Sequence, residues 1–233
     1  MKPRLWPICL ASAAGIVILL GLGVWQVKRL GQKTALIASL EQRMKAEPIS
    51  LTDALLKRSN GEDVEYVKVK ISASPDAAHN LRKLSSVNGS PGWEIITPFK
   101  FDDGSLVLVD MGTVAENQPF VLTPGPQSIE GIIRIHNKGR GFFDVDNDPA
   151  QNLWYWWDLP AMLTGIWPNI ANEAPFIVQK LPIDGDTNPP FVQKPKIELA
   201  NNHLGYAITW FGLAAALAGV TGFYLRSLRK ADA

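Results

Sequence analysis

Residues 201–212 read Asn201-Asn202-His203-Leu204-Gly205-Tyr206-Ala207-Ile208-Thr209-Trp210-Phe211-Gly212, and they open an apolar run that continues to Leu225. No residue between Leu204 and Leu225 is charged. At about 1.5 Å of rise per residue, a helix over this run is about 33 Å long, which is enough to cross a hydrocarbon core of about 30 Å. The stretch therefore predicts a transmembrane helix over residues 204–225.

A polar cluster stands at the head of this predicted helix. Asn202 is the expected N-cap, because its side-chain oxygen can accept from the unpaired N–H groups of the first turn. His203, Tyr206 and Trp210 are spaced i, i+3, i+7, so a helix places them on one stripe. The pattern thus puts one nitrogen ligand above two aromatic rings at the edge of a bilayer.

A second apolar run, from Leu5 to Val27, also lacks charged residues. It is longer than the apolar core of a cleaved signal peptide and has no small-residue cleavage site beyond it, which predicts an uncleaved anchor. The pairs Ala11/Gly15 and Ala215/Gly219 have the small-xxx-small spacing that lets membrane helices approach closely. We therefore expect the two spans to be able to pack as a pair.

Basic residues flank the outer ends of both spans. Lys2 and Arg4 precede the first span, and Arg226, Arg229 and Lys230 follow the second. By the positive-inside rule both termini are predicted to be cytoplasmic, with the domain between the spans in a periplasm-like space. The predicted boundaries are 1–4 (cytoplasmic), 5–27 (transmembrane helix 1), 28–203 (periplasmic domain), 204–225 (transmembrane helix 2) and 226–233 (cytoplasmic).

The composition excludes several classes of function. The chain has 233 residues and a formal net charge of +1, so it carries no electrostatic footprint for nucleic acid. Its one cysteine, Cys9, lies in the first apolar run, which excludes an intramolecular disulfide and a cysteine-based metal cage. No nucleophile elbow, phosphate loop or metal motif is present, which argues against a hydrolase or a phosphoryl-transfer enzyme.

The segment between the spans alternates between strand and helix patterns. An amphipathic pattern over 34–45 continues the first span outward, and short helices are expected over 50–57 and 158–165, the latter capped by Asp158. Strands are expected over 67–71, 93–101, 105–109, 129–135 and 175–181, with a turn cluster at 88–92 and an Asp-Gly hairpin at 103–104. This predicts a membrane α+β protein: two transmembrane helices flank one mainly antiparallel-β soluble domain, a sheet or small barrel, with a few short helices.

Three features of this segment have two readings each. The acidic run 144–149 resembles a calcium loop but lacks the glycine and glutamate that such a loop requires, so a solvated turn is expected. The aromatic stretch 152–158 is either domain core or a membrane-facing surface. His79 and His136 have no second ligand at metal spacing and are expected to be ordinary surface or core histidines.

His203 has both a structural and a chemical reading. It can serve as a helix-end or interface residue. Its place at the positive end of a helix dipole also disfavours protonation, and a neutral imidazole is the common axial ligand of haem iron. Lys28 and Arg29, at the outer end of the first span, would lie at the same depth and could pair with anionic propionates.

Several motifs resemble those of the surfeit locus protein family, the cytochrome c oxidase assembly factors. The similar stretches are 22–33, 92–99 with 103–104 and 107–109, 143–149 with 152–155 and 158–162, and the closing signature 201–211. They follow the family's order over nearly the whole chain. One position departs from the family: after Val107-Leu108-Val109 the usual Arg-Gly-Trp triplet is replaced by Met111-Gly112-Thr113.

The resemblance implies a function. Members of the family lie in the bacterial or mitochondrial inner membrane, assist the maturation of oxidase subunit I, and are held to bind or present haem a. His203 matches the histidine proposed there as axial ligand of the haem iron, and Trp25 and Trp210 match motif tryptophans. The candidate haem-binding residues are Trp25, Gln26, Lys28, Arg29, His203, Tyr206 and Trp210.

Three hypotheses follow from these observations. The first is a haem a chaperone that turns over no substrate and docks with oxidase subunit I, haem A synthase and the lipid bilayer. The second is a non-haem scaffold that stabilises assembly intermediates of subunit I, with His203 in a structural role. The third is an enzyme of the outer domain, against which the lack of a compact catalytic motif counts.

Overall fold

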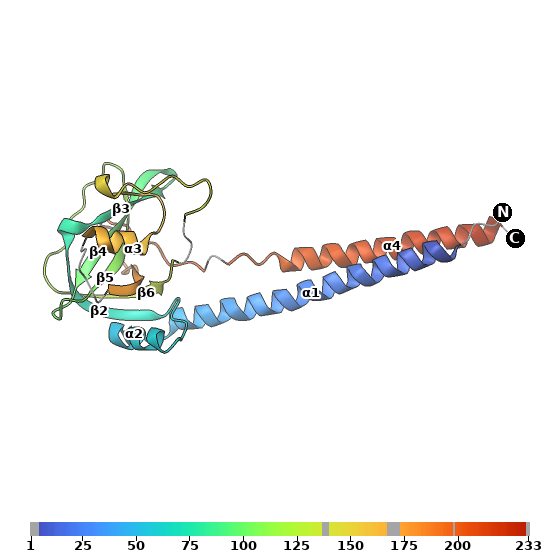
Figure 1. Ribbon diagram of the computed structural model, residues 1–233, viewed down its shortest axis with the longest axis horizontal. Helices are drawn as coiled ribbons and strands as arrows, with labels where there is room; N and C mark the ends of the chain where they lie inside the picture. Colours follow the sequence, from blue (N-terminus) through green and yellow to red (C-terminus); the bar gives the residue numbers. More distant parts are fainter. Residues whose placement is uncertain (1–4, 137–139, 167–172, 198, 232–233) are drawn as a thin grey trace. The chain divides into compact units, whose positions relative to one another are not determined.

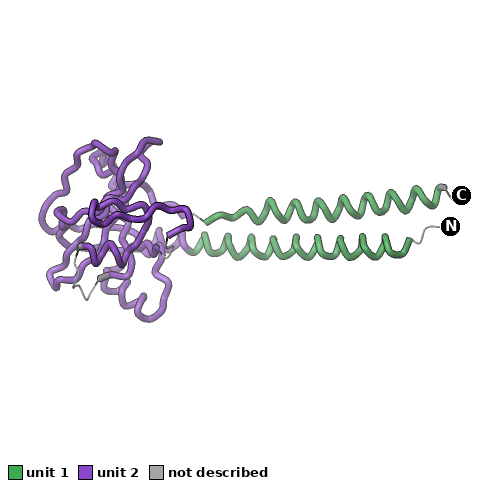
Figure 2. The backbone as a smooth tube through the Cα atoms, turned by 45° about the horizontal axis from the view of Figure 1, so that its top comes forward, with its two compact units in different colours: residues 1–39, 198–233 green, residues 40–197 purple. Residues whose placement is uncertain are grey.

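The computed structural model describes residues 5–136, 140–166, 173–197 and 199–231. Lys2 and Arg4, on which the predicted cytoplasmic N-terminus 1–4 depends, lie outside the described residues. The chain divides into two compact units (Figure 2). The first contains the chain up to Ser39 and from residue 199 onward, and the second contains Leu40–Ile197.

The first unit is a pair of long helices, α1 (Trp6–Lys45) and α4 (His203–Ala231), which lie side by side in Figures 1 and 2. The last turns of α1, from Leu40, belong to the second unit. Both are long and apolar enough to cross a membrane. The two predicted spans fall inside them, and α1 continues without a break through the predicted amphipathic segment 34–45. The expectation of two long terminal helices that pack together is confirmed.

Small residues let the two helices approach. A Cβ atom added at Gly23 would lie 2.6 Å from Phe211 Cε1, and one added at Gly15 would lie 3.0 Å from Leu217 Cδ2. On α4 the buried small residues are Ala207 and Ala214. The helices are therefore close because these positions lack bulk.

The sequence had pointed to a different pair on α4. Ala215 is exposed, and within the described chain nothing lies within 4 Å of a Cβ built at Gly219. Ala215 and Gly219, the small-xxx-small pair on α4, therefore do not form the contact, because the rotation of the helix brings Ala214 to the interface instead. Ser12 and Thr221 add a hydrogen bond of 3.1 Å between the helices.

The second unit is built on an eight-stranded mixed sheet. The strands are β1 (Ile49–Ser50), β2 (Lys68–Pro75), β3 (Leu81–Val87), β4 (Ser90–Lys100), β5 (Leu106–Ala115), β6 (Gln127–Arg134), β7 (Leu153–Trp154) and β8 (Glu173–Lys180). Short helices accompany them: α2 (Leu51–Ser59), η1 (Ala77–His79), η2 (Pro149–Gln151) and α3 (Leu159–Ile166). Five of these strands and both short α-helices correspond to predicted segments.

The strand order is β1-β2-β6-β8-β5-β4-β3-β7, with an additional β2–β4 pairing. That pairing, at Ser74↔Lys100 and Pro75↔Phe99, closes β2, β6, β8, β5 and β4 into a ring. Most pairs are antiparallel, as predicted, whereas β1–β2, β3–β7 and β5–β8 are parallel. The β5–β8 pair is parallel because a long connection through α3 returns the chain to the same end of β5.

Strand β3 was not predicted. The sequence pattern predicts only a turn cluster at 88–92, and a strand that begins at Trp93. In the structure Asn88 and Gly89, both with positive φ, form a two-residue turn that joins β3 directly to β4. Asn-Gly is the favoured pair for such a turn, so the signal was present but was read as a longer loop.

Trp154 is the buried residue of the aromatic stretch 152–158, and its other residues are partly exposed. Trp154 is 1% exposed and packs with Met162 and Ile177 in one of two buried clusters, so the core reading is correct for this side chain. In the nearby acidic run, Asp148 accepts from Gln151 N and Asp146 pairs with Arg140 at 3.1 Å. These carboxylates are engaged in local loop contacts.

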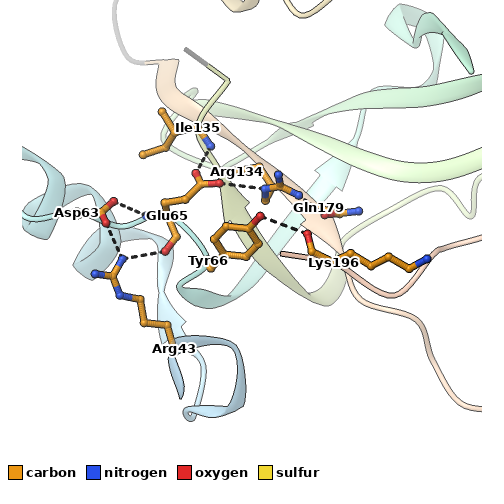
Figure 3. Close-up of polar contacts among 8 residues, drawn as sticks. All are labelled: Arg43, Asp63, Glu65, Tyr66, Arg134, Ile135, Gln179 and Lys196. Atoms are coloured by element: carbon orange, nitrogen blue, oxygen red, sulfur yellow. Dashed lines mark hydrogen bonds and ion pairs between the residues drawn. The ribbon is translucent and has the colours of Figure 1, made fainter. Parts of the chain in front are cut away.

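A polar network joins the two ends of the second unit (Figure 3). Arg43, in the last turn of α1, donates to Asp63 at 2.8 Å and to the Glu65 carbonyl at 3.0 Å. The carboxylate of Glu65 accepts from Arg134 at 3.1 Å, and the Arg134 guanidinium lies 4.6 Å from the centre of the Tyr66 ring. The Tyr66 hydroxyl donates to the Lys196 carbonyl at 3.2 Å. Residues at the beginning and end of this unit are thereby held by one set of contacts.

Candidate functional site

The head of the helix pair contains one close polar contact. His203 Nδ1, in the first turn of α4, lies 2.7 Å from Gln26 Oε1 on α1. Gln26 is only 8% exposed, and His203 is half-buried. Gly23, one turn before Gln26 on α1, and Ala207, one turn after His203 on α4, are both buried. Their small size leaves room for the facing helix, since the ring of Phe211 on α4 lies against Gly23.

This contact sets the chemistry of the imidazole. An amide oxygen accepts and cannot donate, so this contact is a hydrogen bond only when Nδ1 carries the hydrogen. In a neutral ring of that form Nε2 has a lone pair, and among the described residues Nε2 has no hydrogen-bond partner. A neutral imidazole with one nitrogen held by a hydrogen bond and the other free is the form in which histidine binds a metal.

The three aromatic candidates differ in their exposure. Trp25 is 52% exposed and Tyr206 is 56% exposed, so both present open ring faces. Trp210 is half-buried, and its buried Nε1 has no hydrogen-bond partner in the described part of the chain. Helix α4 is continuous from His203, so the predicted stripe of His203, Tyr206 and Trp210 follows from its geometry.

The basic candidates lie on the exposed surface of α1. Lys28 and Arg29 are both exposed, and Arg29 Nη1 donates to Gln32 Oε1 at 3.0 Å within the same helix. Asn201 Nδ2 donates to Thr34 Oγ1 at 3.4 Å, while Asn201 Oδ1 is buried without a partner among the described residues. This end of the helix pair therefore presents one imidazole nitrogen, exposed aromatic faces and two cations.

The second unit contains a polar pocket that sequence reasoning missed. It has a volume of about 100 Å³ and is lined in part by Glu94, Asp110, Gly112 and Thr113. Asp110 is 5% exposed, and its Oδ1 accepts from Gly112 N at 2.9 Å. Burial, together with the Glu94 carboxylate, raises the pKa of Asp110 well above its ordinary value. The available signal was a single aspartate within the otherwise uncharged strand 106–114.

The triplet that departs from the family pattern lies beside this pocket. Met111 is buried in the core, and Thr113 exchanges backbone hydrogen bonds of 3.0 and 2.7 Å with Phe191. A Cβ added at Gly112 would lie 2.5 Å from the Phe191 carbonyl oxygen. The chain around Phe191 therefore packs directly on β5 at this point. Within the described residues no group of three or more His, Cys, Asp or Glu side chains could hold a metal ion.

The sequence profile of the SURF1 family matches residues 13–215, from α1 through the sheet and into α4. The chain belongs to the SURF1 family. Surfeit locus protein 1 of Mus musculus is 34% identical, over 84% of this chain and 68% of the mouse protein. The human protein of the same name is 33% identical, over 84% of this chain and 70% of its own length. The SURF1-like protein of Rickettsia bellii is 29% identical, over 91% of this chain and 88% of its own.

SURF1 proteins are known as cytochrome c oxidase assembly factors and are generally not enzymes. The resemblance noted in the motifs is thus confirmed across most of the chain. Within this SURF1 chain, the structure brings Gln26 and His203 together. Lys28 and Arg29 are exposed on α1, and Arg29 bonds to Gln32. The role of each of these residues is a matter for proposal.

Proposed function

We propose that this SURF1 protein binds or presents haem a for insertion into oxidase subunit I during cytochrome c oxidase assembly, with His203 as axial ligand of the haem iron. The observation that carries the proposal is the 2.7 Å contact of His203 Nδ1 with Oε1 of the buried Gln26, at the head of two membrane-length helices, which leaves Nε2 without a partner among the described residues. Imidazole is a common axial ligand of haem iron, and the donor chemistry of this site therefore suits haem.

The neighbouring side chains suit a flat, anionic, hydrophobic ligand. The exposed rings of Trp25 and Tyr206 and the partly buried Trp210 offer apolar contact to a porphyrin. Lys28 and Arg29 are exposed cations on α1 and are suited to charge-assisted hydrogen bonds with propionates. In this proposal the chain binds, orients and releases its cargo and carries out no chemical step of its own.

The proposed setting is the bacterial inner membrane. α1 and α4 supply the two spans, the termini are cytoplasmic, and the domain over 28–203 is periplasmic. Arg226, Arg229 and Lys230 at the far end of α4 support this orientation. The partners are oxidase subunit I, haem A synthase and the lipid bilayer. A reporter enzyme that is active only in the periplasm is expected to be inactive when fused after Ala233.

An optical spectrum tests the haem proposal. The full chain is produced in membranes that also make haem a, purified in mild detergent, and reduced. We expect a haem a band in the wild type and in the control His79→Ala, and its loss in a folded His203→Ala protein. Equal haem in His203→Ala and the wild type would overturn the assignment of the ligand.

A second function is favoured by one observation. The Gln26–His203 hydrogen bond joins α1 to α4, so His203 also has a structural role in the helix pair. On this reading the protein is a scaffold for subunit I intermediates and binds no haem. If subunit I co-purifies with the wild type in the absence of stoichiometric haem, the scaffold is correct and the chaperone is wrong.

A further inference from the structure

Gln26 is a buried polar side chain in an apolar helix. A carboxamide removed from water without a hydrogen bond destabilises the folded protein, so its contacts need an explanation. Its Oε1 atom has one described partner, His203 Nδ1 at 2.7 Å. The family resemblance predicts that Gln26 contacts haem. The structure directs its carboxamide oxygen at the imidazole.

We infer that Gln26 is a positioning residue that holds the His203 hydrogen on Nδ1 and so keeps the Nε2 lone pair free for a metal. The use of that lone pair rests on the proposed function, whereas the tautomer itself does not. A free neutral histidine favours the opposite tautomer, with the hydrogen on Nε2. The hydrogen bond that the other ring nitrogen makes decides between the two forms.

The packing around Gln26 makes this hydrogen bond directional. Gly23, one turn earlier on α1, is in close contact with the ring of Phe211. Ala207, one turn after His203 on α4, is 3% exposed. The helices are therefore in contact next to the Gln26–His203 pair, and this leaves the carboxamide little freedom to turn away from the imidazole.

In this role Gln26 acts on His203, whereas a haem-contacting residue acts on the haem. A residue that donates to or packs against the ligand would alter ligand affinity alone. A residue that sets the tautomer alters the imidazole before any ligand is present. Hydrogen bonds from the second nitrogen of a metal-bound histidine typically change metal affinity by about 10–100-fold.

The tautomer can be measured directly in the full chain without haem. The protein is labelled with ¹⁵N-histidine, placed in lipid nanodiscs and studied by NMR at about pH 8.5, where an ordinary imidazole is neutral. The chain has three histidines, and the His203→Gln variant identifies the His203 signals. We expect a protonated Nδ1 and an unprotonated Nε2 in the wild type, and a shift of the hydrogen to Nε2 in Gln26→Leu.

Two further variants separate an effect on the His203 tautomer from a loss of folded structure. Gln26→Glu retains an acceptor at the same place and is expected to keep the wild-type tautomer. Gln32→Leu removes an exposed glutamine of the same helix and is expected to change nothing. Unaltered His79 and His136 signals show in every case that the second unit is folded. A hydrogen on Nε2 in the wild type, or no change in Gln26→Leu, would overturn the inference.

Haem loading then tells the two proposals apart. If Gln26→Leu shifts the tautomer and binds haem a roughly 10–100-fold more weakly, both proposals hold. If the tautomer shifts as expected but the wild type binds no haem, Gln26 is a positioning residue and the haem proposal is wrong. If haem binds and the tautomer is the same in the wild type and Gln26→Leu, the inference about Gln26 is wrong.

Discussion

His136 stacks on Trp157, with ring centroids 4.3 Å apart and ring planes 13° from parallel. Lys83 Nζ lies 5.1 Å from the centre of the same indole ring. Burial, with the positive charges of Arg134 and Lys83, lowers the pKa of His136 to about 4. The His136 imidazole is thus neutral at ordinary pH: it stacks on Trp157, and the charges of Arg134 and Lys83 oppose its protonation.

Stability should therefore fall as the pH drops from about 6.5 to 4. In this range the unfolded chain binds a proton at residue 136 and the folded chain does not, so the stability present above pH 6.5 is lost. The slope for one group cannot exceed about 1.4 kcal/mol per pH unit. Hydrogen exchange of the β6 amides, which precede His136, measures this loss.

His136→Phe isolates the contribution of the imidazole. The variant keeps a ring on Trp157 but cannot be protonated, so its stability should depend less on pH over this range than that of the wild type. His79→Gln changes a histidine outside this stack and serves as the control. An identical pH dependence in the wild type and His136→Phe would contradict the assignment.

Asp110→Asn should stabilise the second unit increasingly as the pH rises. The pKa of Asp110 is raised in the folded state, so its favourable contribution is complete below about pH 4 and is lost as the pH rises through the folded pKa. Asparagine resembles the protonated acid and can still accept from Gly112 N. Thermal unfolding from about pH 4 to pH 8 should show a gain in Tm that vanishes at the acidic end. A loss of Tm that is equal at every pH would show that the carboxylate is needed in its charged form.

Gly23→Leu should separate the two long helices, whereas Gly21→Leu should not. A Cβ at Gly23 meets Phe211, but among the described residues nothing lies within 4 Å of a Cβ at Gly21. The two glycines belong to the same helix, so they differ chiefly in this contact. We expect Gly23→Leu to lower the yield of a disulfide between Ser12→Cys and Thr221→Cys, in a Cys9→Ser background, and to disturb the His203 tautomer. Equal yields in the two leucine variants would show that the contact at Gly23 does not set the helix spacing.

The network of Figure 3 predicts an order of effects at the two ends of the second unit. Tyr66→Phe removes one hydrogen bond, to the Lys196 carbonyl, and should cost about 1 kcal/mol. Arg134→Met removes the ion-pair partner of the Glu65 carboxylate, which keeps its hydrogen bond from Ile135 N, and should cost about 2 kcal/mol. Lys100→Met, at an exposed position, should stay within about 0.5 kcal/mol of the wild type. Thermal unfolding measures all three, and a larger loss in Tyr66→Phe than in Arg134→Met would contradict the proposed hierarchy.

Local signals in the sequence predicted much of the second unit. The alternation at 67–71 and the Asp-Gly turn at 103–104 both appear as expected, because side-chain periodicity and turn preference act over a few residues. Strand β3 was not predicted, because its sequence, Leu-Arg-Lys-Leu-Ser-Ser-Val, is mostly polar and leads directly into the exposed hairpin turn. The sequence did not decide between a sheet and a small barrel. The β2–β4 pairing that closes the ring, with Ser74 opposite Lys100, depends on the twist of the whole sheet.

The sequence by itself determined the two long helices and the imidazole at the start of the second, because an uncharged run of about 20 residues is stable across a bilayer only when its backbone is hydrogen-bonded within a helix. Only the tertiary structure decided which side chains these helices bring together. Gln26 and His203 are 177 positions apart, and they meet because Gly23 and Ala207 allow the backbones to approach. Asp110 and Glu94 become neighbours through the register of β4 and β5, which is a property of the sheet. Contacts between distant residues depend on packing, and packing is settled only when the whole chain is folded.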